Sequence, residues 1–214
     1  MIAPYGLKFI IIGAILTIAF GLWSASKDSP PFLVVSIIIA IMTLFLLFFY
    51  RNPLRHIPTE KNLILSIADG RILSVEPIEN EYIGGHGTKV SIFLSLFNVH
   101  INRIPTAGQL DYVKYVPGKF FKAFLDRASE ENEHTEIGLV FGGNRMIFKQ
   151  IAGILARRIT CNASPGQTVH GGEVFGMIHL GSRTELFLPM SVEVLVKKGD
   201  QVKAGQSIIG RIEN

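Results

Sequence analysis

Two long apolar runs at the start of the chain constrain its fold more than any other feature. Residues 7 to 23 and 32 to 50 contain one charged residue between them, Lys8, and a short polar turn, residues 24 to 31, separates them. A helix needs about 20 apolar residues to cross the hydrocarbon core of a bilayer, so the second run is long enough and the first is slightly short. We therefore predict a membrane anchor over residues 1 to 50, built as a two-helix hairpin.

The first run allows two other interpretations. A cleaved signal peptide would end in small residues followed by polar mature sequence, but a second apolar run follows here. One span with a re-entrant or interfacial segment stays open beside the hairpin. Arg51, Arg55 and Lys61 follow the second run, whereas the turn between the runs has Lys27 offset by Asp28. By the positive-inside tendency, we expect the C-terminal part on the cytoplasmic side of the cell membrane.

The rest of the chain, residues 51 to 214, has the composition of a single mostly β (α+β) soluble domain. Short apolar or alternating runs are separated by Gly, Asn, Asp and Pro, which is typical of many short strands joined by turns. The only helical candidate is the segment 120–133, which reads equally well as a loop with one helical turn. The runs that we expect to be strands are residues 63–67, 89–94, 109–116, 136–141 and 146–151.

An internal repeat lies near the C-terminus. The glycines, valine and isoleucine of residues 166–178 recur, almost in phase, in residues 199–212. Each half predicts a turn, a short strand, a second turn and another strand, with glycine where a positive φ is expected. Two such halves resemble the pseudo-symmetric β-sandwich of biotinyl and lipoyl carrier domains, so we expect a sandwich element of that kind at the C-terminus.

Composition excludes several classes of function. A lone cysteine, Cys161, cannot form an internal disulfide, which fits a reducing compartment. The net charge of +4 is scattered along the chain, so no nucleic-acid partner is predicted. The paired Cys or His spacing of a zinc site does not occur in the sequence, and we predict no metal. The oligomeric state, including a homo-oligomer, stays open.

A Gly-Ser pair, Gly181 and Ser182, lies between the two halves of the repeat, where a carrier domain has an exposed hairpin tip. Glycine lacks a Cβ, so a nucleophile can approach its carbonyl closely. Attack by the Ser182 hydroxyl would form an ester, and elimination would release Gly181 as a new C-terminus. Residue 182 would become dehydroalanine and then a pyruvoyl group. Because Gly-Ser is a common turn dipeptide, the pair alone is a weak signal.

Six segments around this pair strengthen the hypothesis because they match, in order, the motifs of one family. They are Phe49–Arg55, Ala68–Ile72 with its Ala-Asp-Gly, Ser91–Pro105, Ala128–Glu133, Ile151–Gly153 with Ala156–Ile159, and Phe175–Arg183. Together they resemble the phosphatidylserine decarboxylases, specifically the short, membrane-anchored form. The resemblance covers about residues 51 to 212, nearly the whole soluble part.

The resemblance implies an enzyme made as a zymogen. Autocatalytic cleavage would leave residues 1–181 and 182–214 associated, with a pyruvoyl group from Ser182 as the cofactor. Such a ketone forms a Schiff base with the substrate amine and serves as an electron sink. The implied reaction converts phosphatidylserine to phosphatidylethanolamine and CO₂, a lyase step of phospholipid biosynthesis carried out among membrane lipids.

The resemblance also implies roles for individual residues. His100 is similar to the family's histidine beside the pyruvoyl group, and we expect it to transfer a proton or orient the carboxylate. Asp69 resembles the acidic residue that assists self-cleavage. Longer bacterial members carry a second histidine where this chain has Arg103. Their Asp-His-Ser relay therefore does not transfer intact: either His100 serves both steps or Arg103 polarises the carbonyl of Gly181.

Two further histidines are candidates for assisting cleavage or substrate binding. His179 lies two residues before the predicted break, where strand packing is the alternative role. His86 lies in a glycine-rich loop, residues 84–87, and would line the substrate entrance unless it belongs to a solvated turn.

Two rival functions stay open at this stage. A related decarboxylase would act on another serine phospholipid, for instance archaetidylserine. A non-enzymatic membrane adaptor of the biotinyl or lipoyl type would need a lysine at the hairpin tip, and residues 180–196 contain none.

Overall fold

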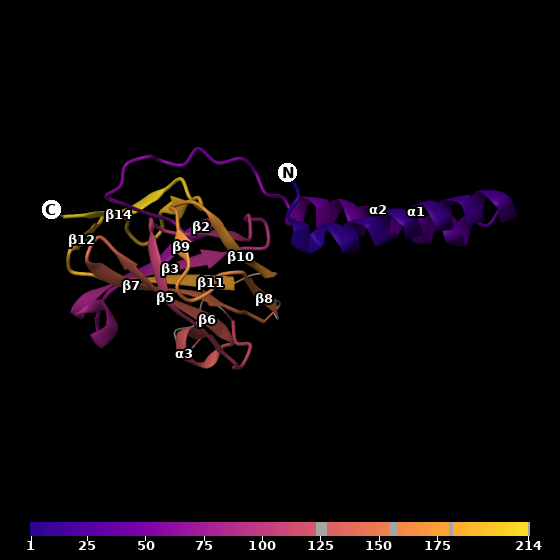
Figure 1. Cartoon of the computed structure of the whole chain (residues 1–214). Helices are drawn as coiled ribbons and strands as arrows, with labels where there is room; N and C mark the ends of the chain where they lie inside the picture. The colour runs from indigo at the N-terminus through magenta and orange to yellow at the C-terminus, as the bar shows by residue number, and fades with distance from the viewer. Residues whose placement is uncertain (123–127, 155–157, 180–181, 214) are drawn as a thin grey trace. The chain divides into compact units, whose positions relative to one another are not determined.

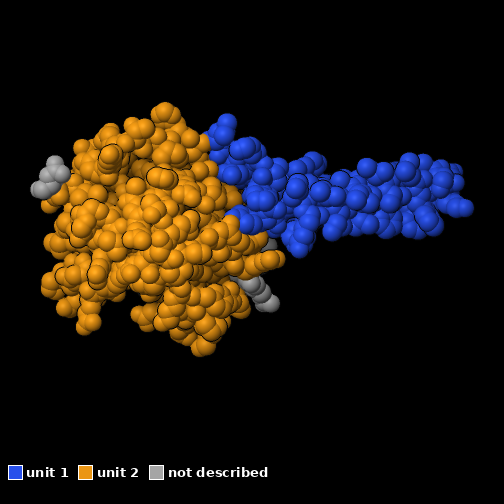
Figure 2. Space-filling view, in the orientation of Figure 1, with its two compact units in different colours: residues 1–54 blue, residues 55–214 orange. Residues whose placement is uncertain are grey.

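The computed structural model describes residues 1–122, 128–154, 158–179 and 182–213. It divides into two compact units, Met1–Leu54 and Arg55–Asn214, which Figure 2 colours separately. The first unit holds a short 3-10 helix η1 (Pro4–Gly6) and two α-helices, α1 (Leu7–Lys27) and α2 (Pro30–Phe49). Both α-helices are long and apolar enough to cross a membrane, by length and composition.

Small and hydroxyl-bearing residues join the two helices of the first unit. Ser36 on α2 donates a hydrogen bond of 2.8 Å to the main-chain oxygen of Thr17 on α1. A side chain at Gly13 would collide with Thr43, so glycine is needed where the helices approach. Asp28 ends α1 in the left-handed conformation, with φ of 46°. Close packing through small residues and interhelical hydrogen bonds is the usual way in which apolar helices associate within lipid.

The second unit is mostly β, as predicted. Its strands, in chain order, are β1 (Leu63–Leu65), β2 (Gly70–Asn80), β3 (Gly85–Leu94), β4 (Ile101–Arg103), β5 (Gly108–Val116), β6 (His134–Phe141), β7 (Asn144–Ile151), β8 (Arg158–Cys161), β9 (Thr168–Val169), β10 (Val174–His179), β11 (Ser182–Pro189), β12 (Val192–Val194), β13 (Gln201–Val202) and β14 (Ile208–Ile212). Two short helices join them, η2 (Glu81–Ile83) and α3 (Ala128–Glu131).

These strands form three sheets (Figure 1). The largest has eight strands in the order β13-β2-β3-β11-β7-β6-β5-β9, and two smaller sheets have the orders β1-β14-β12 and β4-β10-β8. All five predicted strands are present. Of the predicted helical segment 120–133, residues 128–131 form α3, and residues 123–127 lie outside the described part of the chain.

The predicted repeat is confirmed, and it belongs to a larger duplication. In the eight-stranded sheet the equivalent strands are β13 and β9, β2 and β5, β3 and β6, and β11 and β7, so the strand order reads alike from both edges. The registers agree, because Gly70 pairs with Val202 just as Gly108 pairs with Val169. The repeat glycines 166, 172, 199 and 205 all have φ between 70° and 101°. The pseudo-symmetry therefore covers the whole domain.

The duplication assigns a special place to Ser182. In one half, β6 runs into β7 through a tight turn, and Phe141 pairs with Asn144. In the other half the equivalent strands are β3 and β11, and Leu94 pairs with Ser182. All of β4 to β10 is inserted between them. Ser182 is therefore the residue at which the chain returns to the first half of the duplicated domain.

The hydrophobic core lies on one face of the eight-stranded sheet. Because side chains alternate along a strand, the even-numbered residues of β11 share this face. Leu186 and Leu188 of β11 are fully buried there, together with Phe148 of β7 and Ile92 of β3. Ser182 and Thr184 belong to the same set, so two hydroxyl groups point to the core side.

Candidate active site

Ser182 is the first residue of β11, and it is fully buried. Its hydroxyl oxygen has no hydrogen-bond partner among the described residues. The expectation of an exposed hairpin tip was wrong, because β11 is an interior strand that pairs with β3 on one side and β7 on the other. Gly181 lies outside the described residues.

His100 is also fully buried, just before β4. Its main-chain oxygen accepts a hydrogen bond of 3.2 Å from Ile178, on the strand that leads toward Ser182. Its Nδ1 lies 2.9 Å from the carbonyl oxygen of Asn98. A carbonyl only accepts hydrogen bonds, so Nδ1 carries the proton in the neutral ring and Nε2 carries the lone pair. This tautomer suits a group that accepts or returns a proton through Nε2.

His179 ends β10, and its Nε2 lies 3.1 Å from the hydroxyl of Thr160 on β8. Burial, with a smaller contribution from nearby Arg158, lowers the pKa of His179 to about 4. The imidazole is therefore neutral at physiological pH. A neutral ring can accept the Thr160 hydroxyl proton in a hydrogen bond without a buried charge.

Asp69 is held at the start of β2 by two partners. Arg55 contacts both of its carboxylate oxygens, at 2.8 and 3.0 Å, and the amide of Ala204 donates to it at 2.8 Å. Arg55 also donates a hydrogen bond of 3.0 Å to Gln206. Sequence reasoning assigned no role to Arg55, although it closes the Arg-Asn-Pro-Leu-Arg motif. Both carboxylate contacts come from one guanidinium nitrogen, Nη2, whereas Nη1 donates to Gln206.

Arg103 lies beside this ion pair. It donates a hydrogen bond of 2.9 Å to the main-chain oxygen of Gly172. Burial lowers the pKa of Arg103, the positive charge of Arg55 lowers it further, and the carboxylate of Asp69 opposes both. Two predicted site residues, Asp69 and Arg103, therefore lie close together in the structure. Arg55, which was not predicted as a site residue, lies beside both.

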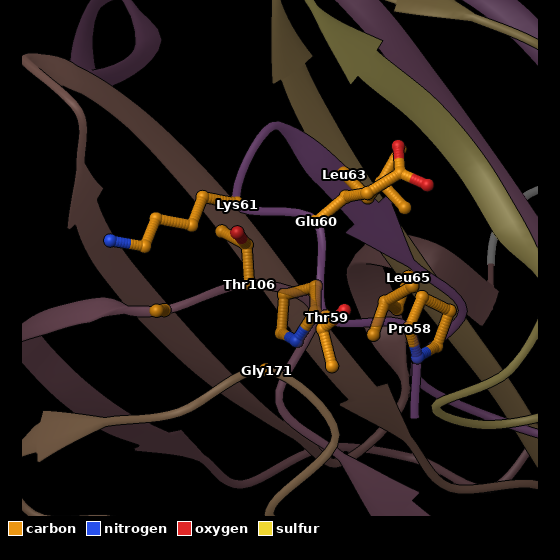
Figure 3. Close-up of a pocket in the computed structure, with 10 residues that line it drawn as sticks. Pro58, Thr59, Glu60, Lys61, Leu63, Leu65, Thr106 and Gly171 are labelled. Atoms are coloured by element: carbon orange, nitrogen blue, oxygen red, sulfur yellow. The ribbon is translucent and has the colours of Figure 1, made fainter. Parts of the chain in front are cut away.

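Only one half of the duplicated domain carries this carboxylate. By the register, Asp69 and Ala204 correspond to Ala107 and Gly171 in the other half. At that equivalent place there is a cavity of about 110 Å³, lined by Ala107, Thr106, Gly171 and the segment 58–61 (Figure 3). Where one half binds an arginine with an aspartate, the other half has a methyl group and an open space. The carboxylate therefore occurs in only one of the two halves of the domain.

His86 is not brought to the site. It is exposed near the start of β3 and pairs with Glu79 of β2, whereas Leu94, the partner of Ser182, is at the other end of β3. At about 3.3 Å per residue, the strand between His86 and Leu94 spans roughly 26 Å.

A buried ionic network lies on the opposite face of β11. Arg183 contacts Glu185 at 2.7 Å, and their side chains are 3% and 0% exposed. Arg183 also donates to the hydroxyl of Ser91 on β3 at 2.8 Å, and Ser129 on α3 donates to Glu185 at 2.7 Å. The network ties the residue after Ser182 to β3 and to α3. The sequence signal was a pair of charges at alternate positions of an apolar strand, which our sequence analysis passed over.

We predict that Glu185→Gln lowers the free energy of unfolding by about 3 kcal/mol or more, because Arg183 is left as a buried charge without its counterion. Glu76→Gln is the matched control. The Glu76 side chain is 47% exposed in its pair with Lys89, so a loss of less than about 1 kcal/mol is expected. Denaturant unfolding in detergent of both variants, each made in the uncut Ser182→Ala chain, measures both losses. Equal losses in the two variants would contradict the importance of the network.

Metal ligands do not gather in the part of the chain that the structure describes. Groups of three or more His, Cys, Asp or Glu side chains placed to hold an ion are absent among those residues. Among the predicted site residues, the groups that could act chemically are the buried Ser182 hydroxyl, the buried imidazoles of His100 and His179, and the Asp69 carboxylate paired with Arg55.

Known proteins similar to this chain agree on one family. The sequence model described as phosphatidylserine decarboxylase matches residues 42–210. A phosphatidylserine decarboxylase proenzyme of Symbiobacterium thermophilum is 48% identical over 177 residues, 82% of each chain. Proenzymes of the same name are 46% identical in Chlorobium phaeobacteroides, over 80% of this chain and 81% of the relative, and 41% identical in Chlorobium limicola, over 99% and 100%. The chain belongs to the phosphatidylserine decarboxylase family, a family of carboxy-lyases.

Proposed function

We propose that this protein removes CO₂ from phosphatidylserine and releases phosphatidylethanolamine, after it has cut its own chain between Gly181 and Ser182. Family membership and one structural observation support this proposal. That observation is the hydroxyl of Ser182, which is fully buried and has no hydrogen-bond partner in the described part of the chain. Such a hydroxyl, shielded from bulk water, suits attack on the neighbouring carbonyl.

The smaller product of this cut has structural reasons to stay bound. Residues 182–214 include β11, β12, β13 and β14. β11 pairs with β3 and β7, β13 pairs with β2, and β14 pairs with β1. All of these partner strands belong to residues 1–181. The fragment would therefore be held by hydrogen bonds on several sides and by the shared core.

A pyruvoyl group formed at position 182 would be held by the backbone of β11, because Ser182 is buried and begins a strand paired with β3 and β7. When present, it supplies a ketone that reacts with the substrate's primary amine and withdraws electrons as CO₂ leaves. His100 would then return a proton to the α-carbon or orient the carboxylate. Either role needs a proton on Nε2, which the ring takes up through its Nε2 lone pair while Nδ1 stays bound to Asn98. Asp69, held by Arg55, would assist self-cleavage. His100 serving both steps and Arg103 polarising the Gly181 carbonyl remain the two alternatives for that step.

The membrane setting follows from the anchor. We propose that α1 and α2 span the cell membrane as a hairpin and keep the catalytic domain on its cytoplasmic side. The acyl chains of a phospholipid substrate stay in the bilayer, so a tethered domain meets the head group at a raised effective concentration. A non-enzymatic adaptor is disfavoured, because the relatives are named as decarboxylase proenzymes.

The activity is tested with the purified full-length protein and vesicles. Phosphatidylserine labelled at the serine carboxyl should release labelled CO₂ and leave phosphatidylethanolamine in the membrane. Archaetidylserine vesicles form the second arm, because an ether-linked glycerol backbone presents the same head group. Release from the ether lipid alone would replace the proposed substrate with the other serine phospholipid. Release from neither lipid would contradict the proposed function.

A further inference from the structure

Three buried polar atoms on the core face of the sheet have no hydrogen-bond partner among the described residues. They are the hydroxyl oxygens of Ser182 and Thr184 and the side-chain oxygen Oε1 of Gln150. All three residues are fully buried. Thr184 and Gln150 are direct partners across β11 and β7, and Ser182 lies two positions from Thr184 on the same face, about 6.6 Å away along the strand.

The orientation of the Gln150 amide follows from its neighbours. Its Nε2 donates to the side-chain oxygen of Asn102 at 2.8 Å and lies 3.4 Å from the main-chain oxygen of Thr160. Both neighbours are acceptors, so the nitrogen must face them. Oε1 is therefore turned away as a pure acceptor. A side chain at Gly176 would collide with the Thr160 oxygen and crowd this amide, so the strand beside Gln150 needs a glycine.

Unmatched buried polar atoms are costly, at about 1–3 kcal/mol each. Proteins commonly meet this cost with a buried water, which makes about three hydrogen bonds to such groups. The hydroxyls of Ser182 and Thr184 and the Oε1 atom of Gln150 would give one water three partners. We propose that Thr184 and Gln150 bind a water molecule that also reaches the Ser182 hydroxyl and carries its proton during self-cleavage.

This inference rests on the proposed cut at Ser182, and the atoms of the step balance. The Ser182 oxygen forms a bond to the carbonyl carbon of Gly181, and the bond from that carbon to the Ser182 nitrogen breaks. The hydroxyl proton passes to the water, which gives a proton to the departing nitrogen and is regenerated. Gln150 Oε1 accepts from the water, while Thr184 can accept or donate. Thr184 is thus a positioning residue that acts through the water.

Substitutions at Thr184 separate this role from packing. Thr184→Val keeps the shape but removes the hydroxyl. It should change the melting temperature little, because valine fills the same volume in the core. The smaller fragment, followed on denaturing gels after cell-free synthesis with membrane vesicles, should appear about tenfold more slowly. Losing a direct proton-transfer group costs about 100-fold or more, and Thr184 acts only through the water. Thr184→Ser keeps the hydroxyl and should cleave at nearly the wild-type rate.

Thr135→Val is the matched control. Thr135 is buried on β6, opposite Gln150 and therefore on the same face, one strand farther from β11. Its substitution should leave the cleavage rate unchanged. Thr184→Ala provides a second chain without the hydroxyl if the valine variant does not fold. Wild-type cleavage rates in the folded hydroxyl-free variants would overturn the inference.

A high-resolution crystal structure of the uncut Ser182→Ala chain provides an independent check. It should show a water within hydrogen-bond distance of Thr184 Oγ1 and Gln150 Oε1, and the absence of a water there would overturn the inference. Different results contradict the proposed function and the water site. A wild-type chain that is never cut contradicts the proposed function, whereas a Thr184→Val chain cut as fast as wild type contradicts the water site alone.

Discussion

Replacing Ser182 with alanine is expected to leave one uncut chain that releases no CO₂ from phosphatidylserine. The variant lacks the hydroxyl that attacks the Gly181 carbonyl, so neither the cut nor the ketone can form. The fold should survive, because alanine is smaller than serine and brings no polar group to the buried position. Denaturing electrophoresis and the labelled-CO₂ assay measure the two outcomes.

Ser191→Ala is the control for this substitution. Ser191 follows the same strand, and its hydroxyl donates to Asn144 at 2.8 Å, away from the proposed cut. That variant should be cut and should release CO₂ like the wild type. If the Ser182→Ala chain were cut between residues 181 and 182, the hydroxyl would have no part in cleavage.

His100→Ala is expected to lower CO₂ release by a factor of about 100 or more, the usual loss when a proton-transfer group is removed. His100 is fully buried, and its Nδ1 is fixed on Asn98, which leaves the proton-accepting lone pair on Nε2. The initial rate of CO₂ release from vesicles is the measurement. The exposed His170 supplies the control, and His170→Ala should be as active as wild type.

The His100→Ala variant also distinguishes the two alternatives for self-cleavage. If His100 serves both steps, His100→Ala remains largely uncut. If Arg103 polarises the carbonyl instead, the variant is cut normally and fails only in decarboxylation. Full activity of a cut His100→Ala protein would remove His100 from the mechanism.

Local patterns predicted the fold class and most of the strands well. The five alternating runs and the glycine repeat became strands and turns because they depend on near-neighbour chemistry. β2 was missed because its outer half carries Glu76, Pro77 and Glu79, which do not alternate with apolar residues. Which strands pair depends on contacts distant in sequence, so the eight-strand order and the insertion of β4 to β10 were not foreseen.

In the candidate site, too, local motifs were predictable and features that depend on distant contacts were not. Ser182, His100 and Asp69 were singled out from motifs, and the structure buries all three. Arg55 and Glu185 were not, because a surface charge and a buried, paired charge look alike in a sequence. The predicted exposed tip at Ser182 failed for a related reason: a Gly-Ser pair between strands predicts a turn, and only the tertiary fold shows that the serine begins an interior strand.

The proposed function requires residue 182 to become a ketone at the start of a separate fragment. Denaturing mass analysis of the purified wild-type protein, treated with a carbonyl-specific reagent, detects this ketone. Two pieces are expected, residues 1–181 and 182–214, with the label on the smaller one. A single unlabelled species near 23.6 kDa, or a smaller piece that begins with an ordinary amino group, would contradict it.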